Sequence, residues 1–242
     1  MINIVRQNAI PASLNTPEIQ TYIQNAILYL NDPDNNPKPE KPVTYRNSDL
    51  LEAFDRDFHS KCYLTELKYL NSWIMDIEHF SPQNERPELI YNWDNLFPAE
   101  HYSNMIKPRT TPVGGYLDSC NPNENVETEI QYTLSVYGYD PQFEATVPGN
   151  VKAVNTCNLL NRVHNGHNET TTKATSDLRH GIHKKYIEVL QKINEWRMHG
   201  VGTPDKIQAR RELKDLLSRK SSFTMLIRSM PAVRQLPQEF LD

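Results

Sequence analysis

The side chains best suited to chemistry lie close together in the first half of the chain. Glu78 and His79 are adjacent, Asn95 follows, and Asn104 and Lys107 form an Asn-x-x-Lys pair. Hydrolysis of a phosphodiester needs a base that activates water and a cation that stabilises the charge developing on the phosphate. A neutral imidazole suits the base because its pKa lies near neutral pH. Carboxylate and amide oxygens suit Mg²⁺.

These residue types predict a division of roles. We expect His79 to be the catalytic base and Asn95 to orient it. We expect Glu78 and Asn104 to hold Mg²⁺ or Mn²⁺ through their oxygens. Each residue alone also has an ordinary interpretation, since a single histidine on an apolar strand is usually a core or surface residue. The order and spacing of the set carry the hypothesis.

The distribution of charge limits where phosphate could bind. The formal net charge is −4, which is not the overall basic character of many nucleic-acid-binding proteins. Residues 110–151 contain no Lys or Arg, whereas basic residues are frequent from 152 to 220. We therefore expect Lys107 and Arg109 to contact nucleic acid at the site. For most other charges, a solvated helix face is an equally good explanation.

A strand, a loop, a second strand and a helix must position these side chains. Residues 73–80 predict a strand that Ser81-Pro82 ends, and residues 81–92 a polar loop. The chain returns through residues 91–96, and Asn104 and Lys107 are expected near the start of a short helix ended by Pro108. Neighbouring residues of a strand point to opposite faces, so Glu78 and His79 reach one site only where the strand ends or bulges.

The flanking segments predict a mainly helical surround. Residues 1–15 form an extended arm in this interpretation, and residues 164–173 a polar loop. Alternation over 130–137, ending at Gly138, predicts a strand with a hairpin partner at 143–147. Apolar periodicity and capping residues predict helices at the following positions: 17–30, from 48, 151–163, 174–198, 204–218, and a last short one through 230.

The central segment resembles the HNH nucleases of the Septu antiphage system, which also occur beside some retrons. The resemblance rests on Glu78-His79-Phe80-Ser81-Pro82, on Tyr91-Asn92-Trp93-Asp94-Asn95-Leu96, and on Asn104 with Lys107. More loosely, it extends over residues 60–200 through the segments 117–122 and 155–162. It implies a ββα-metal core, phosphodiester hydrolysis, and an ABC-type, SMC-like ATPase as partner.

The chain departs from that family at its zinc-binding cysteines. Two Cys-x-x-Cys pairs of the family are here Cys62-Tyr63-Leu64-Thr65 and Glu100-His101-Tyr102-Ser103. A structural zinc site needs a nearly complete set of sulfur and nitrogen ligands. We therefore expect no zinc, although Cys62 with His101, Glu100 and a fourth group would be a conceivable set. We expect packing by Trp73, Phe80, Trp93 and Leu96 to hold the site instead.

Together these observations predict an α+β protein with an HNH core in a mainly helical domain. We divide the chain into an N-terminal part for partner docking (1–60), the nuclease core with a β-hairpin (61–165), and a helical C-terminal region (166–242). The predicted function is metal-dependent cleavage of nucleic acid, with DNA favoured over RNA, in a bacterial antiphage system. The alternative is a catalytically degenerate binding subunit of the ATPase complex. Three cysteines without paired spacing, and the lack of long apolar runs, predict a cytoplasmic protein without a membrane partner.

Overall fold

The chain folds as an α+β protein, in which many helices surround two small antiparallel sheets. The computed structural model describes residues 1–7, 9–42, 46–83, 86–135 and 140–242. Strand β1 (Asp76–His79) pairs with β2 (Leu96–Ala99), and β3 (Ile130–Leu134) pairs with β4 (Pro141–Ala145). The main helices are α1 (Pro17–Asn31), α2 (Ser48–Asp57), α3 (His101–Ile106), α5 (Val151–Asn165), α7 (Ser176–Met198) and α8 (Pro204–Leu217). Shorter ones are α4 (Val126–Glu129), α6 (Glu169–Ala174), α9 (Thr224–Arg228) and α10 (Pro231–Arg234).

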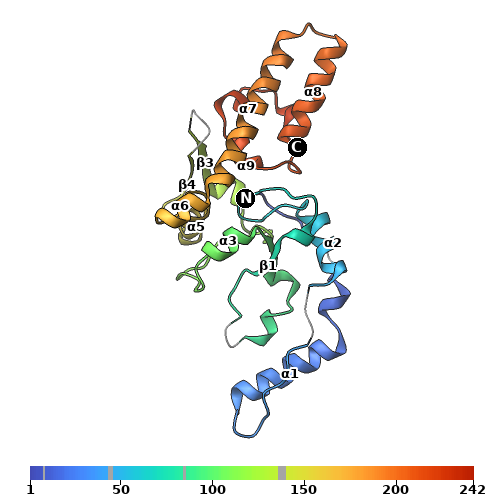
Figure 1. Ribbon diagram of the computed structural model, residues 1–242, viewed down its shortest axis with the longest axis vertical. Helices are drawn as coiled ribbons and strands as arrows, with labels where there is room; N and C mark the ends of the chain where they lie inside the picture. Colours follow the sequence, from blue (N-terminus) through green and yellow to red (C-terminus); the bar gives the residue numbers. More distant parts are fainter. Residues whose placement is uncertain (8, 43–45, 84–85, 136–139) are drawn as a thin grey trace.

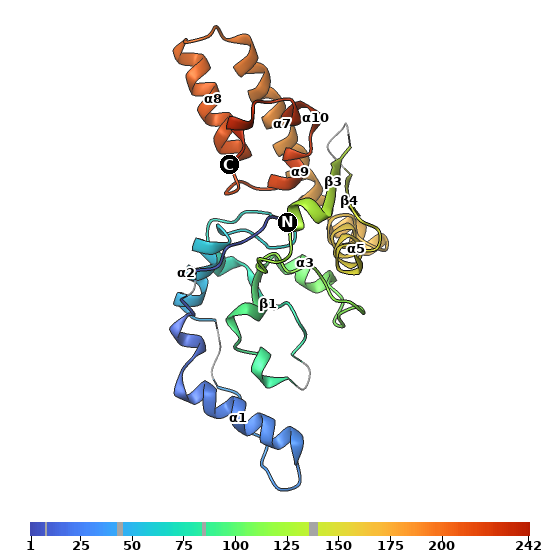
Figure 2. The same cartoon turned by 180° about the vertical axis from the view of Figure 1, so that it is seen from behind.

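The molecule is elongated, with a helical element at each end. Figures 1 and 2 place α1 at one end and the antiparallel pair α7–α8 at the other, with β1 and α3 near the middle. Thr16 caps α1 by accepting a hydrogen bond from the backbone N–H of Ile19, and Pro17 occupies the first turn, as the sequence predicted. In the described parts of the chain, no helix is both long and apolar enough to span a bilayer.

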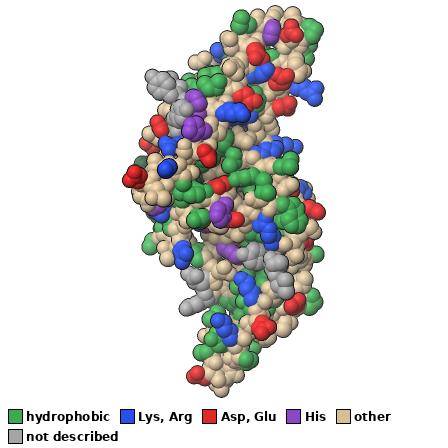
Figure 3. All heavy atoms as spheres, in the orientation of Figure 1, with side chains coloured by type: hydrophobic (Ala, Val, Ile, Leu, Met, Phe, Trp, Pro, Cys, Tyr) green, Lys and Arg blue, Asp and Glu red, His purple; other side chains and the backbone are tan. Residues whose placement is uncertain are grey.

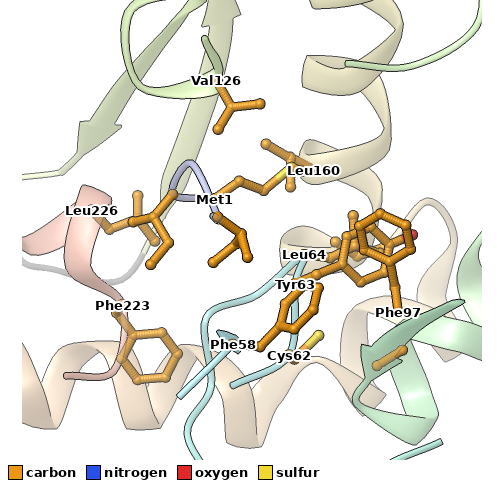
Figure 4. Packing of buried hydrophobic residues seen from close by; sticks show 14 of the residues in the cluster. Met1, Phe58, Cys62, Tyr63, Leu64, Phe97, Val126, Leu160, Phe223 and Leu226 are labelled. Carbon is orange, nitrogen blue, oxygen red and sulfur yellow. The ribbon is translucent and has the colours of Figure 1, made fainter. Parts of the chain in front are cut away.

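One hydrophobic core joins segments that are far apart in the sequence. Met1 from the N-terminal arm lies among Leu64, Val126, Leu160 and Leu226, and all five are buried (Figure 4). Residues of the predicted parts 1–60, 61–165 and 166–242 therefore share this core. The arm is not a detached appendage, because burial of its apolar side chains stabilises the same body.

Several predicted elements are confirmed with small shifts. Helices α1, α2, α5, α7 and α8 form where capping and periodicity predicted them. Strand β4, the hairpin partner of β3, begins at residue 141, two residues before the predicted start at 143. The predicted strand over 130–137 is described as far as residue 134, and its expected end at 136–138 lies outside the described residues.

Other local predictions were wrong. The strand predicted over 73–80 covers only Asp76–His79, because Asn71 caps a 3₁₀ turn that includes Trp73. That turn leaves Trp73 53% exposed, so it is not part of the packing around the site. Residues 164–173 are not a simple loop: Asn168 and Thr171 form a capping box that starts α6. Asn104 and Lys107 lie in the middle and at the C-cap of α3, not at its start.

His164 is a buried ionisable residue that makes the fold sensitive to acid. Its Nδ1 lies 2.8 Å from the Leu160 carbonyl, and its ring packs on Phe143. Burial lowers the pKa of His164 from 6.5 to about 4, so the folded protein holds the neutral ring.

We expect the free energy of unfolding to decrease as the pH falls from about 6.5 to about 4, because His164 is buried in its neutral form. In this window the unfolded chain takes up a proton that the folded chain does not, so the loss approaches about 3 kcal/mol. Urea unfolding followed by circular dichroism across this range measures it. His164→Leu should flatten the slope of unfolding free energy against pH, and an unchanged slope would contradict the assignment.

Candidate active site

A β-hairpin followed by a helix carries the candidate site. β1 and β2 pair antiparallel with Glu78 opposite Phe97 and His79 opposite Leu96, and α3 follows β2 and contacts β1. Aromatic packing stabilises the hairpin. The centroid of the Phe97 ring lies 4.9 Å from that of Tyr63 and 5.2 Å from that of Phe80. Trp93 and Leu96 are buried as the sequence predicted. The arrangement matches the expected strand–loop–strand–helix order.

One surface cavity brings most of the predicted site residues together. Its volume is about 260 Å³, and its lining contains Glu78, His79, Asn104, Lys107 and Arg109, together with Pro82, Gln83 and Pro108. β1 ends at His79, and this strand end allows two neighbouring residues to reach one cavity. The strand therefore ends at Glu78-His79, as it must for both side chains to reach one site. Asn95 does not line the cavity.

His79 is held in a form suited to act as a base. Its Nε2 lies 3.0 Å from the carbonyl oxygen of Ile90. A carbonyl can only accept, so Nε2 carries the proton and the neutral ring has its basic lone pair on Nδ1. Burial lowers the pKa of His79 below 6.5, and the positive charges of Lys41 and Lys107 lower it further. The ring is therefore neutral at pH 7.

Asn95 holds the loop that orients His79 and does not bond to the ring itself. Its buried side-chain amide accepts from the backbone N–H of Ser81 at 2.7 Å and donates to the carbonyls of Ser81 and Leu89 at 3.0 and 3.1 Å. These bonds tie Ser81 and Leu89 of the loop to Asn95, which directly precedes β2. They also fix the backbone next to Ile90, whose carbonyl accepts from His79. Asn95 is thus a positioning residue.

Glu78 is buried and already has two strong partners. Its Oε1 is paired with the ammonium of Lys107, and its Oε2 accepts a hydrogen bond from the Tyr63 hydroxyl at 2.5 Å. Burial raises the pKa of Glu78, and the pairing with Lys107 only partly opposes this. The Lys107 side chain is 7% exposed, so its charge serves Glu78 here and is not presented to solvent. Neither contact was evident from the sequence.

Asp76 is a functional candidate that the sequence reasoning missed. The side-chain amide of Asn104 donates to Asp76 at 3.1 Å, and His101 lies 2.9 Å from the same carboxylate oxygen. Asp76 precedes Glu78 by two positions on β1, and alternation along a strand would have placed both on one face. Asn104 also lines a second cavity of about 420 Å³ with Asp76, whose lining includes Lys41 and Arg46.

The oxygens at the cavity fit a hard divalent cation. Glu78 offers a carboxylate and Asn104 an amide oxygen, and both residues line one cavity. Among the described residues, no group of three His, Cys, Asp or Glu side chains could hold a metal ion. Mg²⁺ itself commonly takes few protein ligands, because this ion retains several waters. The pairing with Lys107 opposes binding of a metal by that carboxylate, because the two cations repel each other.

The four positions of the family's zinc cysteines form hydrogen bonds with their neighbours. The buried thiol of Cys62 bonds with Thr65 and with the backbone of Glu100, and burial raises its pKa. The Glu100 carboxylate caps α3, accepting from Ser103 Oγ at 2.8 Å and from the N–H groups of Tyr102 and Ser103. His101 turns instead to Asp76. Polar contacts thus occupy this corner, where we had expected packing alone.

Comparison with known proteins adds nothing to this geometry. No family model matches the sequence, and searches of curated proteins and of solved structures found no match.

Proposed function

We propose that this protein is a metal-dependent HNH endonuclease that hydrolyses phosphodiester bonds in nucleic acid, DNA in preference to RNA. The observation that carries the proposal is the cavity shared by Glu78, His79 and Asn104 on a hairpin–helix unit. A base, a carboxylate and an amide oxygen are the groups that this hydrolysis requires. All three line one cavity, which supports this proposal.

In this mechanism His79 removes a proton from the attacking water through Nδ1. Its Nε2–H remains bonded to the Ile90 carbonyl, and the imidazolium formed during the reaction keeps that bond. Asn95 keeps the ring in place through the loop backbone. Glu78 and Asn104 would hold a divalent cation, which supplies charge stabilisation for the phosphate and the leaving oxygen. Arg109, at the exposed edge of the cavity, neutralises a neighbouring phosphate.

The charge on the surface suits a local phosphate contact. On the face shown in Figure 3, acidic and basic side chains are intermixed, without one broad basic face. Cations instead line the two cavities that meet at Asn104: Lys107 and Arg109 in one, Lys41 and Arg46 in the other. We expect nucleic acid to run across both cavities, where few charges suffice to place one phosphate.

The biological setting that we propose follows from the resemblance to Septu nucleases. An ABC-type ATPase would bind this protein and control its cleavage of nucleic acid during phage infection. Helix α1 is a candidate docking element, because Ile27, Leu28 and Leu30 are all 40% or more exposed on it.

Removal of metal should abolish cleavage. We expect plasmid DNA, single-stranded DNA or RNA to be cut in the presence of the partner ATPase and Mg²⁺ or Mn²⁺, and not after addition of EDTA. Restoring Mg²⁺ in excess should restore cleavage, because Glu78 and Asn104 are hard oxygen ligands. Gel electrophoresis of the three substrates measures the result and identifies the preferred one. Cleavage that persists in EDTA would exclude the metal role.

One observation favours the non-enzymatic alternative. Glu78 is fully engaged by Lys107 and Tyr63, as in a structural ion pair. A binding subunit of the ATPase complex with this core would protect cells equally well when His79 is alanine. Plaque counts for wild-type and His79→Ala strains separate the two functions, since a nuclease loses protection and a scaffold keeps it.

A further inference from the structure

The ammonium of Lys107 lies in a small cage of oxygen atoms at the end of β1. It is paired with Glu78 Oε1, and it donates to the carbonyl oxygens of His79 at 3.3 Å and Phe80 at 3.1 Å. An ammonium has three N–H donors, so these three oxygens satisfy it completely. Both charged side chains are more than nine-tenths buried, at 7% and 8% exposure.

Such a cage suits any hard cation, and Lys107 competes for it. The other oxygen of Glu78 is engaged by the Tyr63 hydroxyl, so Lys107 holds the remaining strong acceptor of that carboxylate. A divalent cation at the same oxygen would lie a few ångströms from the ammonium, where repulsion between them is large in a partly buried site. Each cation therefore weakens the binding of the other at Glu78.

Lys107 has room to leave. It lies at the C-cap of α3 on a flexible four-carbon side chain, and the adjoining cavity of about 260 Å³ opens beside Arg109. Movement into this cavity would place the ammonium where a nucleic-acid phosphate is expected. The Lys107 ammonium could then neutralise Glu78 in the protein without nucleic acid, and a phosphate in the protein with nucleic acid bound.

We propose that Lys107 is a built-in competitor for the metal face of Glu78, which keeps divalent cations weakly bound until nucleic acid draws the ammonium away. The inference rests on the proposed function for the identity of the arriving cation. It adds a consequence for regulation: metal and nucleic acid bind cooperatively, because each favours the displaced position of Lys107.

Metal titration tests this without any measurement of cleavage. We expect Lys107→Met to bind Mn²⁺ at least about tenfold more tightly than the wild-type protein in the absence of nucleic acid, because the competing charge is gone. Arg109→Met, which removes a charge from the same cavity but not from Glu78, should change affinity much less. Isothermal titration calorimetry at about pH 8, with melting temperatures to confirm folding, gives both values. Equal affinities of Lys107→Met and wild type, or an equal gain in Arg109→Met, would overturn the proposal.

A second measurement uses the wild-type chain and does not depend on a folded variant. Lys107 should resist acetylation by a lysine-reactive ester, and saturating Mn²⁺ without nucleic acid should raise its labelling severalfold, read by peptide mass spectrometry. Lys68, which is bonded to the carbonyl of Lys220, is the internal reference. Labelling of Lys107 that does not respond to Mn²⁺ would contradict displacement. If no substrate is cleaved yet Mn²⁺ still displaces Lys107, the inference stands and the nuclease function fails.

Discussion

Replacement of His79 by alanine is expected to lower the cleavage rate by about 10²- to 10⁴-fold, the usual contribution of a positioned general base. The physical reason is the tautomer: the bond from Nε2 to the Ile90 carbonyl assigns the basic lone pair to Nδ1. His79→Gln is the sharper variant, because its amide can still donate to Ile90 but cannot take up a proton. Single-turnover cleavage with the ATPase partner and Mg²⁺ measures the effect.

The dependence of the rate on pH should identify the same residue. A base must be deprotonated, so the rate rises with pH and levels off above the pKa of His79. Because burial lowers that pKa below 6.5, we expect the half-maximal rate below pH 6.5. His167→Ala, at an exposed histidine outside the cavity, is the control and should retain full activity. Full activity of His79→Gln would exclude the mechanism, whatever the substrate.

Replacement of Glu66 by alanine is expected to destabilise the fold by about 3–5 kcal/mol, the range for removing one partner of a buried ion pair. Glu66 lies between two buried cationic groups, the Met1 ammonium at 2.9 Å and the Lys61 ammonium at 3.4 Å. Lys61 also donates to the backbone carbonyls of Arg219 and Ser221. Without Glu66, these cations would be left in the core with no anionic partner.

A matched surface pair separates this effect from the general loss of a carboxylate. Glu88 pairs with Arg86 at 2.9 Å, and both side chains are about half exposed. Glu88→Ala should therefore change the free energy of unfolding by no more than about 1 kcal/mol. Urea unfolding followed by circular dichroism gives both values. If the two substitutions cost the same, Glu66 does not hold the core together.

The contribution of Glu66 to stability should be lost at lower pH than that of His164. Although burial opposes it, the neighbouring Met1 and Lys61 charges lower the pKa of Glu66 from 4.5 to about 2. The stabilisation is therefore complete above pH 4.5 and is lost as the pH falls towards 2. His164 acts between about 6.5 and 4, so the two residues account for successive parts of the acid transition.

Local chemistry let the sequence predict many elements correctly. Thr16-Pro17 starts α1, and alternating Ile130, Tyr132 and Leu134 form β3 with their side chains buried. These features depend on neighbours in the chain, so spacing reveals them. The short strand at Glu78-His79 was also predicted, but its length was overestimated, because the cap at Asn71 competes with extended structure over residues 72–74.

The sequence alone determined the chemical types at the site and their order along the chain. Glu78, His79, Asn95 and Asn104 could be proposed as site residues from type and spacing, because hydrolysis of a phosphodiester needs few kinds of group. Only the tertiary structure decided what each group contacts. The pairing of Lys107 with Glu78, and of Glu66 with Lys61 and the Met1 ammonium, depends on how separate segments pack. Burial then strengthens these charge interactions, and no periodicity in the sequence records that.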